Sequence, residues 1–98
     1  MISVQFAGYS CEVAIEQYPT KLKRIQLYTM GNPRMPVATA TVNLPEAAWL
    51  LPKSHVLIKD YAENSGILDA LIEAGVISEP LDQIFTDYAS VQVCQLLM

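Results

Sequence analysis

A short amphipathic helix is predicted for the stretch NSGILDALIEAGV, residues 64–76, and this element decides the fold. Its apolar residues recur at helical spacing and form one stripe: Ile67, Leu68, Leu71 and Ile72. Asn64 or Ser65 can cap the first free amides, and Gly75 can take the left-handed conformation that ends a helix. We therefore expect a helix over about residues 66–74. Because so short a helix is not stable in isolation, its stripe must pack on a sheet.

Alternating apolar and polar residues predict β-strands on both sides of this helix. The predicted strands cover residues 2–6, 11–18, 24–29, 37–42, 56–58 and 88–97. Segments rich in Gly, Asn and Pro between the first four strands can reverse the chain. The predicted fold class is α+β: an antiparallel sheet of five or six strands, with a meander first and a long C-terminal strand last. The one helix packs on one face of this sheet.

The chain has the size and composition of a single domain spanning residues 1–98. Its 52% hydrophobic and 16% charged content argue against disorder. No apolar run approaches the roughly 20 residues of a membrane helix, and the first residues lack the basic and apolar segments of a secretory signal. We therefore expect a cytoplasmic protein with no membrane partner. In that reducing compartment Cys11 and Cys94 are expected to be buried thiols, with a disulfide between them as the alternative.

The charged residues divide the chain into two parts of opposite sign. Up to Lys59 the sequence has all six basic residues and three acidic ones, whereas from Asp60 onward it has seven acidic residues and no Lys or Arg. The acidic part disfavours nucleic-acid binding, because phosphate contacts need Lys and Arg. It is suited to a protein partner with a basic surface, although ordinary solubilising charge explains the same residues. Self-association, with the basic part of one copy against the acidic part of another, is a further alternative.

One basic group lies near aromatic residues. Lys21, Lys23 and Arg24, with Tyr18 and Tyr28 nearby, have the residue types that bind single-stranded nucleic acid. Three charges are too few for such a surface, and a solvated strand end is the better explanation.

Few residues can carry catalytic or metal chemistry. His55 is the only histidine, and no nucleophile motif surrounds Ser54, Cys11 or Cys94. Two distant cysteines and one histidine cannot form a structural zinc site, and the four glycines form no phosphate-binding loop. We therefore expect no catalytic residue, no metal and no cofactor, and we interpret His55 as a strand-end or surface histidine.

The segment DYAEN, residues 60–64, places two carboxylates and an amide immediately before the helix. A hard-cation site or an acid/base pair is one interpretation, but a calcium loop needs several more oxygen ligands. The structural interpretation places Asp60 and Glu63 near the positive end of the helix dipole, with Asn64 as the cap. We favour the structural interpretation.

Trp49 belongs to an apolar patch, Trp49-Leu50-Leu51, that lies between two prolines. An exposed tryptophan of this kind would be an interface anchor, because aromatic residues dominate binding hot spots. A place in the core is the alternative, and the small size of the domain favours it.

Four stretches together resemble an uncharacterised family of short bacterial, phage and mobile-element proteins, a domain of unknown function. They are residues 39–45 (TATVNLP), 58–68 (IKDYAENSGIL), 70–77 (ALIEAGVI) and 93–97 (VCQLL). The resemblance implies an accessory protein of a phage or mobile element and no particular activity. The chain departs from the family pattern between Ser78 and Ala89, where a glycine-containing turn is expected and EPLDQIFTD is found. This departure puts any ligand role of that loop in doubt.

The leading functional hypothesis is a non-enzymatic accessory protein that binds another protein, a host-defence inhibitor being one instance. The predicted partner-binding residues are Trp49, Asp60, Tyr61, Glu63, Asp69 and Glu73. One alternative is a small-ligand-binding protein or enzyme, with a pocket near Asp60, Tyr61, Glu63 and His55. The other alternative is a structural homo-oligomer.

Overall fold

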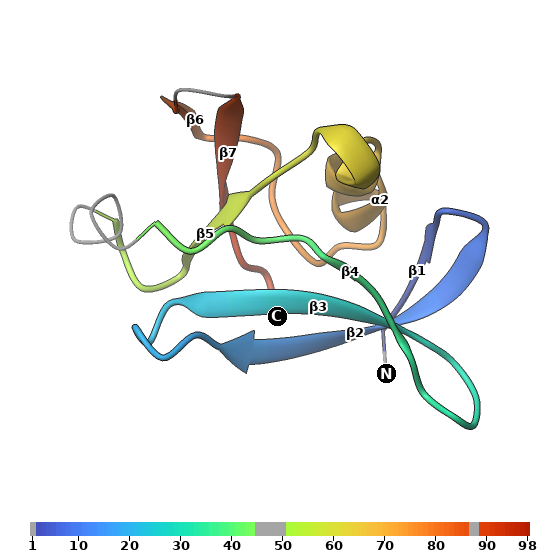
Figure 1. Cartoon of the computed structure of the whole chain (residues 1–98). Coiled ribbons are helices and arrows are strands. Elements are labelled where there is room, and N and C mark those ends of the chain that lie inside the picture. Colours follow the sequence, from blue (N-terminus) through green and yellow to red (C-terminus); the bar gives the residue numbers. More distant parts are fainter. Residues whose placement is uncertain (1, 45–50, 87–88) are drawn as a thin grey trace.

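The computed structural model of the chain describes residues 2–44, 51–86 and 89–98, which form two antiparallel sheets and one α-helix (Figure 1). The first sheet has the strand order β1–β2–β3–β4, with bounds Ser3–Phe6, Tyr9–Gln17, Lys23–Thr29 and Pro36–Thr39. The second sheet has the order β5–β7–β6, with bounds His55–Ile58, Ser90–Gln95 and Asp82–Phe85. The predicted α+β class is confirmed. The prediction of a single sheet of five or six strands is wrong, because the described strands divide into a four-stranded and a three-stranded sheet.

The predicted meander forms the first sheet. Phe6 pairs with Tyr9, so the β1–β2 hairpin turns through the two residues Ala7 and Gly8. Both have positive φ, 54° and 82°, as the tight turns that suit the twist of a hairpin require. In β2 the side chains of Cys11 and Val13 are buried, which agrees with the alternation in the sequence.

The chain passes from the first sheet to the second at Ala40 and Thr41, in the middle of the predicted fourth strand. The backbone nitrogen of Ala40 donates to the carbonyl oxygen of Ile25 in β3 at 2.9 Å, and its own carbonyl oxygen accepts from the nitrogen of Lys59 at 2.9 Å. Thr41 then pairs with Ile58 of β5 as an isolated bridge. One short segment therefore joins the two sheets, and β4 ends at Thr39.

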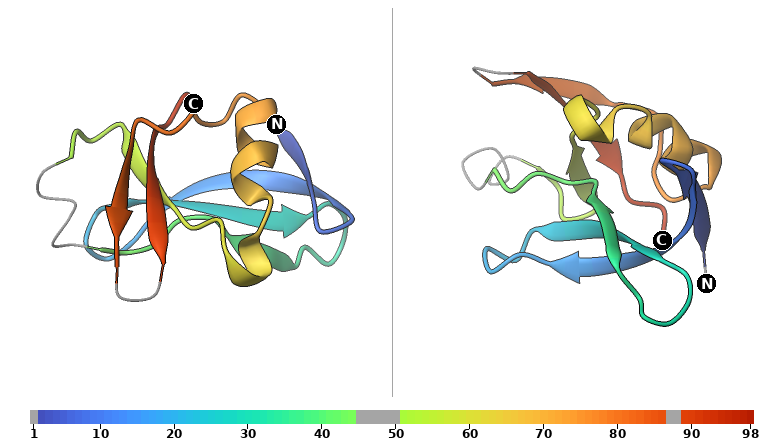
Figure 2. Two further views of the ribbon diagram at one scale, coloured as in Figure 1. Left: turned by 90° about the horizontal axis from the view of Figure 1, so that it is seen from above. Right: turned by 45° about the vertical axis from the view of Figure 1, so that its right-hand side comes forward.

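The predicted helix is confirmed as α2, Ile67–Glu73. Its end is a Schellman motif: the nitrogen of Val76 donates to the carbonyl oxygen of Leu71 at 3.0 Å, and Gly75 has φ 78°. Helix α2 and the second sheet lie side by side over the same face of the first sheet (Figure 2). The apolar stripe of α2 joins the main core there, because Ile67 and Leu71 are fully buried.

Strand β7 is the centre of the second sheet and is buried on both faces. Cys94 belongs to the main core between the two sheets, whereas Val91 and Val93 form a second apolar cluster with Leu57 on the opposite face. Ile84 of β6 packs against this second cluster. The predicted C-terminal strand is thus confirmed over Ser90–Gln95, and its predicted first residues lie partly outside the described ranges.

Among the described strands, β6 is the one that the sequence patterns do not predict. It pairs with β7 from Asp82 to Phe85 and is an edge strand of the second sheet. The side chain of Phe85 is 78% exposed. In the part of the chain that the structure describes, no helix is long and apolar enough to cross a bilayer.

Candidate functional site

Asp60 caps helix α2 from six residues upstream. Its Oδ1 atom accepts hydrogen bonds from the backbone nitrogens of Gly66, at 2.9 Å, and Leu68, at 3.1 Å. A carboxylate in this position satisfies two free amides and interacts favourably with the positive end of the helix dipole. The N-cap residue itself is Gly66, with φ 95° and no side-chain cap hydrogen bond.

Asn64 has a different role from the predicted one. The prediction that Asn64 or Ser65 caps the helix is wrong, because Asn64 is buried and its amide points into the fold. Its Nδ2 atom donates to the carbonyl oxygens of Thr39, at 2.7 Å, and Lys59, at 3.3 Å. Asn64 therefore ties the short 3₁₀-helix η1, Ala62–Asn64, to the end of β4.

The remaining predicted partner-binding residues lie near the same helix. Glu63 in η1 and Asp69 and Glu73 in α2 are exposed, and Tyr61 is 36% exposed. Asp69 and Glu73 are four residues apart and so share one side of the helix. We call Tyr61, Glu63, Asp69 and Glu73 the acidic face. Trp49 lies outside the described residues.

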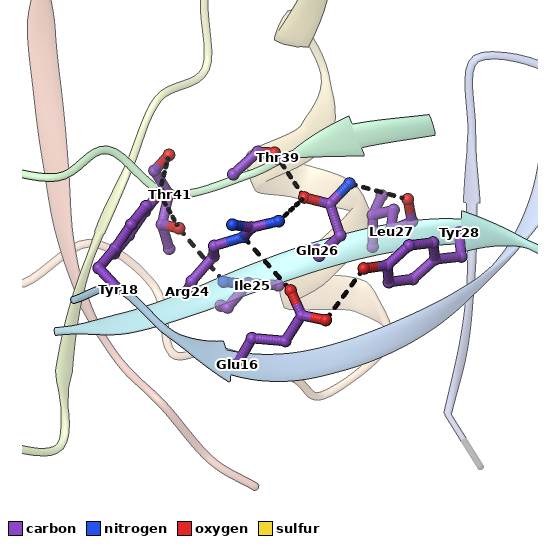
Figure 3. A network of polar contacts seen from close by, with 9 residues as sticks. All are labelled: Glu16, Tyr18, Arg24, Ile25, Gln26, Leu27, Tyr28, Thr39 and Thr41. Atoms are coloured by element: carbon purple, nitrogen blue, oxygen red, sulfur yellow. Dashed lines mark hydrogen bonds and ion pairs between the residues drawn. The ribbon is translucent and has the colours of Figure 1, made fainter. Parts of the chain in front are cut away.

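The outer face of the first sheet carries a polar network (Figure 3). Gln26 is only 3% exposed, and its Oε1 atom accepts hydrogen bonds from Thr39 Oγ1 and, at 3.4 Å, from Arg24 Nη2. Arg24 Nε also forms an ion pair with Glu16 Oε1 at 3.3 Å. The hydroxyl of Tyr28 donates to the other oxygen of Glu16 at 2.9 Å.

Arg34, the second arginine of the chain, also interacts with side chains of this face. Arg34 Nη2 lies 3.0 Å from Glu12 Oε1, and the guanidinium carbon lies 3.7 Å from the centre of the Tyr28 ring. The hydrogen bond from Tyr28 to Glu16 raises the pKa of the Tyr28 hydroxyl. Both arginines are therefore paired with a glutamate on this face.

A pocket of about 260 Å³ lies between the β2–β3 turn and the start of β5. Three lysines line it: Lys21 from the turn, Lys23 from the start of β3, and Lys53 from the segment before β5. His55 and Gln17 also line it, and the apolar residues of its wall are Leu22, Val42, Leu51, Pro52, Val56 and Leu57. We call this the lysine pocket.

The lysine pocket differs from the ligand pocket that the sequence analysis weighed. His55 lines it, but Asp60, Tyr61 and Glu63 do not. In the sequence Lys21 and Lys23 form a charged group with Arg24, and nothing there connects them with Lys53. Those two segments are far apart in the chain, and no local pattern brings them together.

Both cysteines are free, buried thiols, as predicted. Burial raises the pKa of Cys94 to about 11, and burial also raises the pKa of Cys11. Such thiols are poor nucleophiles, because the thiolate is the reactive form. Among residues 2–44, 51–86 and 89–98, no group of three or more His, Cys, Asp or Glu side chains could hold a metal ion.

Comparisons with protein-family models, with curated proteins and with solved structures found no match for this chain.

Proposed function

We propose that the protein is a non-enzymatic accessory protein that binds another protein through the acidic face. The observation that carries this proposal is a difference in ion pairing between the acidic residues of the first sheet and those near α2. Glu12 and Glu16 on the first sheet are each paired with an arginine. Within the described ranges, Glu63, Asp69 and Glu73 take part in no ion pair.

Unpaired carboxylates on one side of a protein favour a partner with basic residues. They steer the encounter over a distance of about a Debye length, roughly 10 Å at 0.1 M salt, and suppress binding to acidic surfaces. Tyr61, the N-cap residue of η1, adds a partly exposed aromatic ring, and tyrosine is common among residues that dominate binding energy. The acidic face thus combines the charge for recognition with an apolar contact.

Two further features support the accessory role. The buried thiols have raised pKa values, so neither cysteine is set up as a nucleophile. The resemblance to short phage and mobile-element proteins favours an accessory protein of that kind, acting in the cytoplasm, with inhibition of a host defence as one instance.

The test is a capture experiment with charge-reversed variants. Asp69→Lys/Glu73→Lys reverses two of the three carboxylates of the acidic face, whereas Glu79→Lys/Asp82→Lys reverses two exposed acids in and near β6 and changes the net charge equally. Host lysate is passed over each immobilised protein, and bound proteins are quantified by mass spectrometry. A partner of the acidic face is retained by the parent protein and by the β6 variant, lost by the α2 variant, and released at high salt.

A direct measurement then completes the test. The captured partner is purified, and its Kd for the three proteins is measured by calorimetry, after circular dichroism has shown that all three are folded. Loss of the parent interaction in both variants, or in neither, contradicts the proposal. Sedimentation of the parent protein at low and high salt separates this function from the homo-oligomer alternative, which requires a salt-sensitive increase in mass.

A further inference from the structure

From the lysine pocket we infer a second binding site, for a small organic phosphate with an apolar or aromatic body. The inference rests on a concave site with a largely apolar wall, at which every charged lining residue that the structure describes is a lysine. At about 260 Å³ it is slightly below the roughly 300–1,000 Å³ of typical small-molecule sites. It therefore fits a small ligand, or one end of a larger one.

The turn that supplies Lys21 and leads into Lys23 at the start of β3 is held in a defined shape. The nitrogen of Tyr18 donates to the carbonyl oxygen of Leu22 at 2.9 Å, and the nitrogen of Lys21 donates to the carbonyl oxygen of Tyr18 at 2.8 Å. Gln17 Nε2 also donates to the carbonyl oxygen of Lys21 at 3.3 Å. Lys21 has φ 72°, a left-handed conformation that costs energy for a residue with a Cβ. The turn thus fixes the backbone at Lys21. Less backbone conformational entropy is therefore lost when a ligand binds.

The charges of the pocket are not balanced by the residues that line it. Among the described residues that line it there is no Asp or Glu, and within the same ranges none of the three lysines belongs to an ion pair. Both arginines, by contrast, are held by glutamates on the other face of the first sheet. Three like charges around one concavity repel one another, and an anion between them relieves that repulsion. Lysine is a compact donor that binds phosphate oxygens as a point charge.

The wall of the pocket explains why the anion should carry an apolar body. Leu22 and Leu51 are partly exposed at the pocket, and Val56 and Leu57 close it from β5. His55 adds a further polar group, because its buried Nδ1 atom has no hydrogen-bond partner among the described residues. Inorganic phosphate would use the lysines alone, whereas a phosphate ester would also cover the apolar wall.

This site is separate from the acidic face. The β2–β3 turn lies at one end of the first sheet, and α2 lies toward the other end (Figure 1). Ligand binding at the lysine pocket and partner binding at the acidic face can therefore be tested independently. The two sites share no residue, so variants of one leave the other unchanged.

The experiment is a titration of the ¹⁵N-labelled full chain with phenyl phosphate, followed by amide chemical shifts. Phenol, which lacks the phosphate, and inorganic phosphate, which lacks the ring, are titrated in parallel. The inference expects saturable shifts in residues 21–23 and 53–57 with phenyl phosphate, weaker binding of inorganic phosphate, and no saturable shift with phenol. Added sodium chloride should weaken the binding of phenyl phosphate.

Single lysine variants identify the groups that bind. Lys21→Gln and Lys53→Gln should each raise the Kd for phenyl phosphate about tenfold, the loss of one charge-assisted contact. Lys59→Gln is the matched control, because Lys59 carries the same charge but does not line the pocket, and it should leave the Kd within about twofold. The inference is overturned if no saturable shift occurs, if phenol binds as tightly as phenyl phosphate, or if Lys59→Gln weakens binding as much as Lys53→Gln.

Discussion

The Oδ1 atom of Asp60 lies 3.1 Å from the backbone nitrogen of Leu68, in the first turn of α2. This contact spans eight positions of the chain, and the same oxygen also accepts from Gly66. Because the N-cap residue is a glycine without a side chain, Asp60 supplies the capping acceptor oxygen that a serine or asparagine at the N-cap position commonly supplies.

Replacement of Asp60 should therefore destabilise the fold in the manner of a lost helix cap. We expect Asp60→Ala to reduce the free energy of unfolding by about 1 kcal/mol, and Asp60→Asn, which keeps an acceptor oxygen, to reduce it by less. Urea denaturation measures both. Glu63→Gln is the control, since Glu63 is exposed, and equal losses from Asp60→Ala and Glu63→Gln would refute this role of Asp60.

Asn64 should be one of the most sensitive polar residues of the chain. Asn64→Ala removes the donor to the carbonyl oxygens of Thr39 and Lys59, and both of these oxygens lie where the chain passes between the sheets. We expect a loss of about 1–3 kcal/mol in the free energy of unfolding, measured by urea denaturation. The neighbouring exposed residue offers the comparison: Ser65→Ala should change stability by less than about 0.5 kcal/mol. A similar effect of the two substitutions would argue against the bridging role.

Gly75 provides a test of backbone strain without steric overlap. A Cβ atom at this position would meet no other heavy atom within 4 Å, so the positive φ of 78° is the only obstacle. Gly75→Ala should lower the stability by about 1–2 kcal/mol. Gly75→Asn should cost less, because asparagine tolerates the left-handed region better. Thermal unfolding of the two variants compares them directly, and a more stable alanine variant would contradict the Schellman assignment.

Cys94 should make the stability depend on pH in the alkaline range. Burial raises its pKa from 9.0 to about 11, so between these values the folded state keeps a proton that the unfolded state releases. The stability contribution of the neutral thiol is complete below pH 9 and is lost as pH rises toward 11. The slope from this one group is at most about 1.4 kcal/mol per pH unit.

The control for this prediction is Cys94→Ala, measured by urea denaturation at several pH values. The variant lowers stability at all pH values, because it leaves a cavity, but it should lack the part of the slope that comes from this thiol. The parent protein and the variant contain the same tyrosines, so the difference between their curves of stability against pH excludes the contribution of tyrosine titration. Parallel curves from pH 9 to 11 would show that the Cys94 thiol titrates as it does in the unfolded chain.

The elements with strong local patterns could be predicted from the sequence. The apolar stripe of α2 and Gly75 behind it defined the helix, and the alternation in Cys11–Tyr18 and Ser90–Gln95 defined two strands and their faces. Strand β6 could not be predicted, because Asp82-Gln83-Ile84-Phe85 contributes one partly buried side chain and is a strand through its pairing with β7. The division into two sheets depends on which strands pair, and alternation carries no information about that choice.

The same limit applies to the candidate sites: residues of one helix could be placed from the sequence, whereas a pocket formed by distant segments could not. The exposed acids of α2 follow from helical spacing, and the structure places them where that spacing implies. The lysine pocket depends on the approach of Lys53 to the β2–β3 turn. In the sequence Arg24 groups with Lys21 and Lys23, but in the folded chain Arg24 pairs with Glu16 on the outer face.

The central position of β7 has a consequence for how the chain folds as it leaves the ribosome. All four strands of the first sheet precede residue 40, so their hairpins can pair early during synthesis, which proceeds at about 5–20 residues per second. Strands β5 and β6 both pair with β7, which follows them in the chain, so the second sheet forms only after β7 has been synthesised. Until β7 has emerged, the nascent protein exposes the apolar side chains that β7 will cover, and a stall before Ser90 leaves β5 and β6 without the strand with which both of them pair.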